Sequence, residues 1–583
     1  MTLTELGALL APAFALYRRY MGPKRQAALM GLLLGLAQPP FGFLPGLLAY
    51  SVLLWSLDQD LGPKPLRRAF AIGWWAGFLY FLVGCFWVAE AFLVDASNQG
   101  WMAPFAVCLL PGGIALFWGA AFAAYRKLVT GPLTGHWSRW LVFAGLFCLF
   151  EWLRGTILTG FPWNPAGATW KAGSAVSQLA ALFGVYGLSL FTVTLFASPA
   201  VSRRDEGLKG LWPVAVSALI LVAGLGFGAV RLATTEVAPT QTWIRIVQPN
   251  IGQRAKWSEG ALLRVMRDYV AYSRAHAGRE ILQTVTKRDR KPYPDVIVWP
   301  EGALPDAAEN LLDPQSETAN LFAGLLQPDQ ILLWGAYHRA VDDQNALVWR
   351  NSLLALSRDE TGTNYQVVYS KFKLVPFGEF LPFESVLESL GVKELAHVGD
   401  GFSPGPRTRP VEVEGLPPFL PLICYEGLFP ALAKGERPSS SAPLRPSWIV
   451  NISNDAWFGP TTGPVQHLNL SSYRAIEEGL PMVRSTPTGV SAIIDPLGRI
   501  VEGSEIRIGQ SGFRDVLLPE AVSFAPYTLW RHLHLMLVAL FCLIPLIFVT
   551  FVNVSKNNQE NDRVPDPDGA GFTTKKQHGD NAG

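Results

Sequence analysis

The sequence has too few charged residues for an ordinary soluble enzyme. Charged residues make up 16% of the 583-residue chain, and hydrophobic residues make up 50%. Because about a quarter of the residues in a typical soluble domain are charged, part of this chain is expected to lie in lipid. The 48 basic and 46 acidic residues leave a formal net charge of +2 and form no long basic run. This balance argues against nucleic acid as a partner.

The motifs of several large enzyme classes are absent as well. The sequence contains no GxxxxGK[ST] phosphate loop, no HExxH helix and no GxSxG turn, and its eight histidines are scattered without metal-ligand spacing. Each of these motifs places a nucleotide, a zinc ion or a nucleophilic serine. Nucleotide, zinc and serine-hydrolase mechanisms are therefore disfavoured, and no metal or diffusible cofactor is predicted.

Cysteine is scarce, and one of the five cysteines is set apart from the others. Cys85, Cys108, Cys148 and Cys542 fall in long apolar runs, where a free cysteine is usually a small core residue. Cys424 has no second cysteine within the polar stretch 234–528, so no disulfide can form there. An unpaired thiol in an oxidising compartment is prone to oxidation. Cys424 is thus either an inert buried thiol or a thiol that the protein uses.

Apolar runs that approach the ~20 residues of a membrane-spanning helix recur along the chain. They cover roughly 70–92, 104–125, 140–158, 175–198, 212–233 and 530–552. The run 26–58 is split by Pro39 and Pro40 and is predicted to form two short helices, since proline interrupts a helix. Together these runs predict about eight transmembrane helices.

Basic residues are unevenly distributed between alternate loops. One set of loops contains Arg18, Arg19, Lys24, Arg25, Lys64, Arg67, Arg68, Arg126, Lys127, Arg139, Arg203, Arg204 and Lys209. The opposite set contains Lys171 alone. Because basic loops stay in the cytoplasm, both termini are predicted to be cytoplasmic, and the stretch 234–528 is predicted to lie on the outer side.

These patterns divide the chain into five predicted parts. They are an N-terminal cytoplasmic or interfacial segment (1–25), seven transmembrane helices (26–233), an outer domain (234–528), a last transmembrane helix (529–552) and a disordered cytoplasmic tail (553–583). The N-terminal segment has its basic residues after its apolar part, unlike a cleaved signal peptide. The tail has too little apolar content to fold.

Short β-type runs alternate with amphipathic segments in the outer domain, which is typical of an α/β fold. The predicted strands are 243–248, 295–300, 331–337, 351–357, 366–371, 420–425, 448–453 and 490–495, and the predicted helices are about 258–276 and 464–479. The strands are almost continuously apolar, which favours sheets covered on both faces. The Gly- and Pro-bearing segment 387–410 is predicted to be a loop, either over the site or on the surface.

Three chemically useful groups follow predicted strands, where α/β sheets gather their active sites. Glu301 follows "VIVWP", Lys371 closes "QVVYSK" and Cys424 closes "LPLIC". A thiol becomes a useful nucleophile when a base accepts its proton and a cation stabilises the anions that follow. Taken singly, however, the carboxylate and the lysine are more often surface groups. Lys373 would share a strand face with Lys371, so spacing does not choose between them.

Six motifs resemble those of the bacterial apolipoprotein N-acyltransferase family. In the outer domain they are "VWPEGALP" (298–305), "YSKFKLVPFGEFLP" (369–382), "ICYEGLFP" (423–430) and "NISNDAWFGPTTGPVQH" (451–467). In the apolar half they are "FWVAEAF" (86–92) and "EWLRGTILTGFPW" (151–163). The resemblance runs from about residue 25 to 550. It implies a nitrilase-like α-β-β-α sandwich on a multi-pass helical membrane domain.

The resemblance also implies a catalytic triad. Its members would be Glu301 as general base, Lys371 as the oxyanion-stabilising group and Cys424 as the nucleophile. The family pattern selects Lys371 and leaves Lys373 as a neighbour.

Further residues are implied to assist the triad. Glu379 corresponds to the family's second acidic residue, and Tyr425 and Glu426 follow the nucleophile. Trp257 corresponds to a family tryptophan, and Trp257 and Trp457 are candidates for lining a lipid entrance.

The implied reaction transfers the sn-1 acyl chain of a phospholipid, through a cysteine thioester, to the α-amine of a diacylated apolipoprotein in the bacterial inner membrane. A membrane-anchored amidase and an inactive domain on a transporter are the alternatives. Within the membrane half, Glu151 and Arg154 lie three residues apart on one helix face. They are predicted to form a structural ion pair or to contact a lipid headgroup.

Overall fold

The computed structural model describes residues 22–545 except 131–132, 135, 277–290, 343, 360–361, 381, 383–400, 431 and 433–444, and also 547, 563–565 and 572–574. Most of the segment 1–25, of the loop 387–410 and of the tail 553–583 therefore lies outside the described residues. Within the tail, β11 (Arg563–Pro565) pairs antiparallel with β12 (Phe572–Thr574), so the tail predicted to be disordered contains two short strands. A pair this short is only marginally stable by itself.

The first half of the chain is helical. Its helices are α2 (Pro23–Ala37), η1 (Leu44–Leu48), α3 (Ala49–Asp58), α4 (Pro65–Cys85), α5 (Val88–Leu93), α6 (Ala96–Gln99), η2 (Gly100–Met102), α7 (Ala103–Leu128), α8 (Arg139–Thr156), η4 (Ala166–Thr169), η5 (Val176–Leu179), α9 (Ala180–Ala197), η6 (Ser198–Val201), η7 (Arg204–Leu211) and α10 (Trp212–Thr234). Proline occupies the first turn of α2, α4, α7 and α10, where its missing N–H costs no hydrogen bond.

Among the described residues, four helical segments are long and apolar enough to cross a membrane. They are Pro65–Cys85, Ala96–Leu128, Val176–Val201 and Glu206–Thr234, and Leu44–Asp58 and Leu533–Pro545 are apolar but shorter. Helices occur at every predicted apolar run, but the count of eight spans is not confirmed by the described residues. The predicted run 70–92 also differs, because α4 ends at Cys85 and α5 begins at Val88.

A buried ion pair joins Glu151 and Arg154 within α8. Arg154 Nη2 lies 2.8 Å from Glu151 Oε2, and both side chains are only 1% exposed. The indole of Trp118 donates to Glu151 Oε1 at 2.8 Å, and Arg154 donates to the carbonyls of Phe161 and Trp163. These contacts favour the structural interpretation of the pair, which fixes the loop after α8.

Two β-sheets form the centre of the second half. The six-stranded sheet has the order β10-β1-β2-β3-β4-β5, and the four-stranded sheet has the order β6-β7-β8-β9. The strands are β1 (Pro239–Gln248), β2 (Val296–Val298), β3 (Ile331–Val341), β4 (Leu347–Asp359), β5 (Gly362–Ser370), β6 (Phe419–Ile423), β7 (Trp448–Ile452), β8 (Met482–Ser485), β9 (Ala492–Ile494) and β10 (Gly512–Pro519). All eight predicted strands are present, and β8 and β10 are additional.

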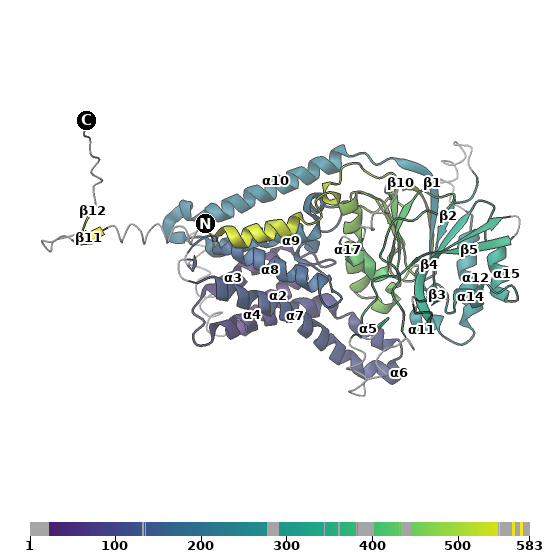
Figure 1. The fold of residues 1–583 in the computed structure, drawn as a ribbon, viewed down its shortest axis with the longest axis horizontal. Coiled ribbons are helices and arrows are strands. Elements are labelled where there is room, and N and C mark those ends of the chain that lie inside the picture. The colour runs from purple at the N-terminus through teal and green to yellow at the C-terminus, as the bar shows by residue number, and fades with distance from the viewer. Residues whose placement is uncertain are drawn as a thin grey trace.

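The two sheets pack face to face with helices on their outer faces (Figure 1). Apolar side chains of both sheets, such as Val298, Leu333, Ile423 and Val450, form the core between them. The helices α11 (Gln253–Lys256), α12 (Ala261–Arg274), α14 (Ala308–Leu311) and α15 (Glu317–Ala323) belong to the side of the six-stranded sheet, and α12, α14 and α15 share its outer core. The helix α17 (Gly463–Glu478) covers the four-stranded sheet. The predicted α-β-β-α sandwich is therefore confirmed.

The helix α17 also packs against α9 of the helical half, so one helix serves both halves (Figure 1). Asn469 Oδ1 accepts a hydrogen bond from the backbone N–H of Ala172 at 2.8 Å. Glu477 Oε1 accepts one from Val185 N–H, also at 2.8 Å. Because these side chains are buried, the junction is part of the core and not a flexible linker.

A buried ion pair joins the neighbouring strands β1 and β10, and it predicts a large stability effect. Arg245 and Asp515 are directly opposed in the ladder and lie 2.7 Å apart, with side chains 2% and 3% exposed. Asp515→Asn leaves the Arg245 charge buried without a counter-charge, which costs about 3–5 kcal/mol. Thermal unfolding in detergent, followed by tryptophan fluorescence, should show a clearly lower midpoint.

Glu317→Gln is the matched control, because Glu317 pairs with Arg267 at the surface and an exposed pair contributes only about 0–1 kcal/mol. Equal midpoints for the two variants would contradict the assigned importance of the buried pair.

Candidate active site

Cys424 lies at a sharp turn between the four-stranded sheet and a short helix. It directly follows β6 and is the first residue of η8 (Cys424–Leu428). Its backbone φ is +50°, a left-handed conformation that costs a non-glycine residue energy and is concentrated at functional sites. The Cys424 side chain is buried at this turn.

Glu301 and Lys371 approach this turn from the other sheet. Glu301 lies three residues beyond β2, and Lys371 directly follows β5. Lys371 Nζ donates to Glu301 Oε1 at 3.0 Å, and both side chains are almost completely buried. A Cβ on Gly335 of β3 would lie 2.4 Å from Glu301 Cα, so glycine at this position lets the Glu301 turn sit close to the strand.

Asn351 and Glu379 complete the hydrogen bonding around the lysine. Lys371 Nζ donates to Glu379 Oε1 at 2.9 Å. Asn351 Nδ2 donates to Glu301 Oε1 at 2.6 Å and to Glu379 Oε1 at 2.9 Å. Glu379 was expected from the sequence, but Asn351, a mid-strand residue of β4, was not. Its only signal is a polar side chain at the start of the buried stretch of β4.

The charges in this cluster set the protonation of the thiol and the amine. Burial lowers the pKa of Lys371, but the carboxylates of Glu301 and Glu379 outweigh it and raise the pKa well above its usual value. Burial and the Glu301 charge raise the pKa of Cys424 to about 12. The resting site therefore holds a neutral thiol beside a cation. Glu301 Oε2 is buried and has no hydrogen-bond partner among the described residues.

Glu426 bonds both to the segment around Lys371 and to the turn that carries Cys424. Its Oε1 accepts hydrogen bonds from the Tyr369 hydroxyl at 2.6 Å and from the N–H groups of Phe372 and Lys373 at 2.9 and 3.0 Å. Its Oε2 accepts one from Ile423 N–H at 2.8 Å. A carboxylate engaged by four donors holds the strand ends β5 and β6 together. This arrangement suits support better than proton transfer.

Two side chains beside the triad point toward the membrane half. Lys373 Nζ donates to the carbonyl of Thr159 at 3.2 Å, whereas Lys371 faces the carboxylates. The hydroxyl of Tyr425 donates to the carbonyl of Gly160 at 2.6 Å. The nucleophile turn is thereby attached to the loop that follows α8.

The tryptophans differ in exposure. Trp257 follows α11 and is 55% exposed, and Trp457 lies in η9 (Asp455–Phe458) with intermediate exposure. Trp163, in contrast, is 1% exposed, and its indole donates to Gln466 Oε1 at 2.9 Å. Trp163 is therefore a core residue of the junction with α17.

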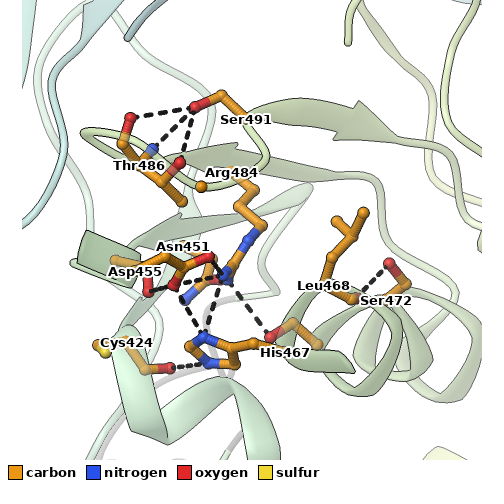
Figure 2. A network of polar contacts seen from close by, with 12 residues as sticks. Cys424, Asn451, Asp455, His467, Leu468, Ser472, Arg484, Thr486 and Ser491 are labelled. Carbon is orange, nitrogen blue, oxygen red and sulfur yellow. Dashed lines mark hydrogen bonds and ion pairs between the residues drawn. The ribbon is translucent and has the colours of Figure 1, made fainter. Parts of the chain in front are cut away.

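A second polar cluster, formed by Asp455, His467 and Arg484, lies beside the nucleophile (Figure 2). His467 of α17 places Nε2 3.2 Å from the carbonyl oxygen of Cys424 and Nδ1 2.9 Å from Asp455 Oδ1. Arg484 of β8 pairs with Asp455 at 2.8 Å, and its Nη2 lies 3.1 Å from His467 Nδ1. All three side chains are at most 1% exposed. The motif 451–467 contains Asp455 and His467, but the sequence assigned neither of them a role, and Arg484 lies outside the motifs quoted above.

A cysteine, a lysine and a carboxylate at strand ends of an α-β-β-α sandwich, joined to a helical half, define a membrane-associated protein of the carbon-nitrogen hydrolase class. The family model described as "Carbon-nitrogen hydrolase" matches residues 244–507. The model described as "Apolipoprotein N-acyltransferase N-terminal domain" matches residues 30–198. The chain belongs to the apolipoprotein N-acyltransferase family.

Curated relatives named "Apolipoprotein N-acyltransferase" support this assignment. The protein from Caulobacter vibrioides is 45% identical over 513 residues, which are 88% of this chain and 91% of that protein. The protein from Rhodopseudomonas palustris is 38% identical over 85% of this chain and 89% of that protein. A solved amidase of the nitrilase superfamily from Nesterenkonia AN1 is 15% identical, with 51% of this chain and 97% of that chain covered and a TM-score of 0.30.

The raised pKa of Cys424 predicts a particular pH dependence of alkylation. Since only the thiolate reacts with iodoacetamide and the Cys424 pKa is about 12, the thiolate fraction should rise about tenfold per pH unit from pH 7 to pH 9. Peptide-level mass spectrometry of the modified protein measures this rate. A plateau above pH 8 would show that the thiol has a much lower pKa.

Proposed function

We propose that this protein transfers a fatty acyl chain from a phospholipid to the N-terminal amine of an apolipoprotein, with Cys424 as the acyl carrier. The observation that carries the proposal is the buried arrangement of Glu301, Lys371 and Cys424 in a chain of this family. Lys371 holds one oxygen of Glu301, and the other oxygen has no partner among the described residues. A carboxylate in this state can accept a proton, and the ammonium can stabilise an oxyanion.

In the first half-reaction, Cys424 attacks the sn-1 ester carbonyl of the phospholipid. The thiol proton passes to Glu301, and an S–C bond forms as the carbonyl oxygen becomes an oxyanion. Lys371 and the backbone N–H of Tyr425 stabilise this oxyanion. The ester C–O bond then breaks, and the leaving alkoxide takes the proton from Glu301. The products are an acyl-thioester on Cys424 and a lysophospholipid.

In the second half-reaction, the α-amine of a diacylglyceryl-cysteine attacks the thioester. A C–N bond forms, the C–S bond breaks, and Glu301 transfers the amine proton to the departing thiolate. The enzyme is thereby restored, and the lipoprotein carries a third acyl chain. The high pKa of the resting thiol suits this cycle, because the nucleophile is ionised only when Glu301 receives its proton.

The membrane half supports a lipid substrate and an inner-membrane location. Both substrates keep their acyl chains in the bilayer while the ester and the amine react at its outer surface. With the catalytic domain on the periplasmic side and both termini in the cytoplasm, the site faces that surface. Trp257 is exposed at the edge of the site region and, with Trp457, would line the lipid entrance. The amidase alternative is less supported, because an amidase of soluble substrates needs no membrane half.

The proposal predicts a covalent intermediate. Purified protein incubated with phospholipid alone should gain the mass of one acyl chain on the peptide that contains Cys424, because the donor half-reaction needs no acceptor. Hydroxylamine should remove the added mass, since it cleaves thioesters. Absence of the adduct under conditions where a diacylated lipopeptide is turned over would contradict the thioester mechanism.

Replacement of the nucleophile tests its assignment. Cys424→Ala should remain folded and membrane-inserted but lose N-acylation of a diacylated lipopeptide by at least about 10³-fold, as expected when a covalent nucleophile is removed. Lipopeptide acylation followed by mass spectrometry measures the loss. Cys542→Ala, in the last helix, is the matched control and should retain activity. Substantial activity of Cys424→Ala would exclude Cys424 as the acyl carrier.

A further inference from the structure

The carbonyl group of Cys424 is held by an imidazole from a different element. His467 Nε2 lies 3.2 Å from this oxygen, and the His467 side chain is 1% exposed. A carbonyl oxygen only accepts hydrogen bonds, so Nε2 carries the proton and donates. Figure 2 shows the imidazole beside Cys424, with one ring nitrogen toward the Cys424 carbonyl and the other toward the Asp455–Arg484 pair.

The other ring nitrogen is engaged as well. Arg484 Nη2 lies 3.1 Å from His467 Nδ1 and bonds to both oxygens of Asp455, at 3.0 and 2.8 Å. Burial and the Arg484 charge lower the pKa of His467, which favours the neutral ring. Nδ1 also lies 2.9 Å from Asp455 Oδ1, so this nitrogen faces both a donor and an acceptor. The carbonyl of Cys424 can only accept, so the Nε2 contact with it requires a proton on Nε2.

The Arg484–Asp455 pair is itself fixed from several elements. Arg484 also donates to Asn451 Oδ1 of β7, and Ser453 Oγ donates to Asp455 Oδ1 at 2.7 Å. Asn451 Nδ2 donates to the carbonyl of Leu422, two residues before the nucleophile, at 3.1 Å. The imidazole is thus part of a buried hydrogen-bond network that contacts the carbonyls of Leu422, before the turn, and of Cys424, within it.

The carbonyl of Cys424 belongs to the same peptide group as the N–H of Tyr425. In a planar trans peptide the C=O and N–H bonds point in opposite directions. A donor that fixes the direction of the carbonyl therefore also fixes the direction of the N–H. The left-handed φ of Cys424 makes this restraint necessary, because a strained turn persists only where its surroundings hold it.

We propose that His467 is a positioning residue for acyl transfer, which fixes the Cys424–Tyr425 peptide so that the Tyr425 N–H points at the developing oxyanion. This inference rests on the proposed function, because the oxyanion forms only if Cys424 accepts an acyl group. The residue touches neither substrate nor reacting atoms. It acts through the peptide group that supplies the donor.

A pair of amide variants tests the proposal. The amide nitrogen of His467→Gln can reach the place of Nε2, and that of the shorter His467→Asn cannot. Removal of an oxyanion donor lowers turnover by about 10²–10³-fold, so the Asn variant should form the Cys424 thioester from phospholipid about 10- to 100-fold more slowly, while the Gln variant stays within about threefold of the wild type. His338→Asn is the matched control, because His338 is a buried histidine of β3 in the same domain.

Alkylation of Cys424 by iodoacetamide separates positioning from a general structural role. This reaction needs the thiolate but no oxyanion donor, so its rate should change less than about twofold in the Asn variant. Parallel losses of acylation and alkylation, unchanged acylation in the Asn variant, or failure of the Gln variant to recover would each overturn the proposal. If the Asn variant does not fold, the Gln variant decides alone, and a loss of acylation above about tenfold overturns the proposal.

A wild-type protein that forms no thioester would contradict the proposed function itself. Thioester formation by the wild-type protein is therefore measured before any His467 variant. This order distinguishes failure of the proposed function from failure of the proposal for His467.

Discussion

The buried ammonium of Lys371 is the interaction on which the site depends. It lies within 3.0 Å of two carboxylates, Glu301 and Glu379, and Asn351 donates to both of them. Two like charges in a buried site repel each other strongly unless a cation lies between them. The lysine therefore allows two carboxyl groups to lie side by side in a buried site. In the proposed reaction the same charge would also stabilise the oxyanion.

The two halves of the molecule are joined through the same elements that build the site. The helix α17 covers the sheet that carries Cys424 and also packs on α9. From one face of this helix His467 reaches the nucleophile turn, and from another Asn469 and Glu477 bond to the membrane half. One helix thus bonds both to the turn that carries Cys424 and to the membrane half.

Much of the outer domain follows from local sequence pattern, because its strands are continuous apolar runs. The ends of these runs also indicate Glu301, Lys371 and Cys424, whose grouping follows from the general behaviour of strand ends. The strands β8 and β10 were missed because buried charges interrupt them. Arg484 and Asp515 are tolerated only through partners that are distant in the sequence. The roles of Asn351 and His467 were missed for the same reason, since a strand amide and a helix imidazole acquire their roles from tertiary contacts alone.

The loop after α8 places the thiol at a defined depth. Arg154, inside the helical half, donates to the carbonyls of Phe161 and Trp163 in this loop. The carbonyl of Gly160, in the same loop, accepts a hydrogen bond from the Tyr425 hydroxyl. The position of Cys424 is thereby fixed relative to a helix of the membrane half as well as to its own sheet. Since the ester linkages of a phospholipid lie at one level of the bilayer whatever the length of the acyl tail, a thiol held in this way meets short and long chains at the same height. The site would then select substrates by the position of the ester bond and not by the length of the acyl chain.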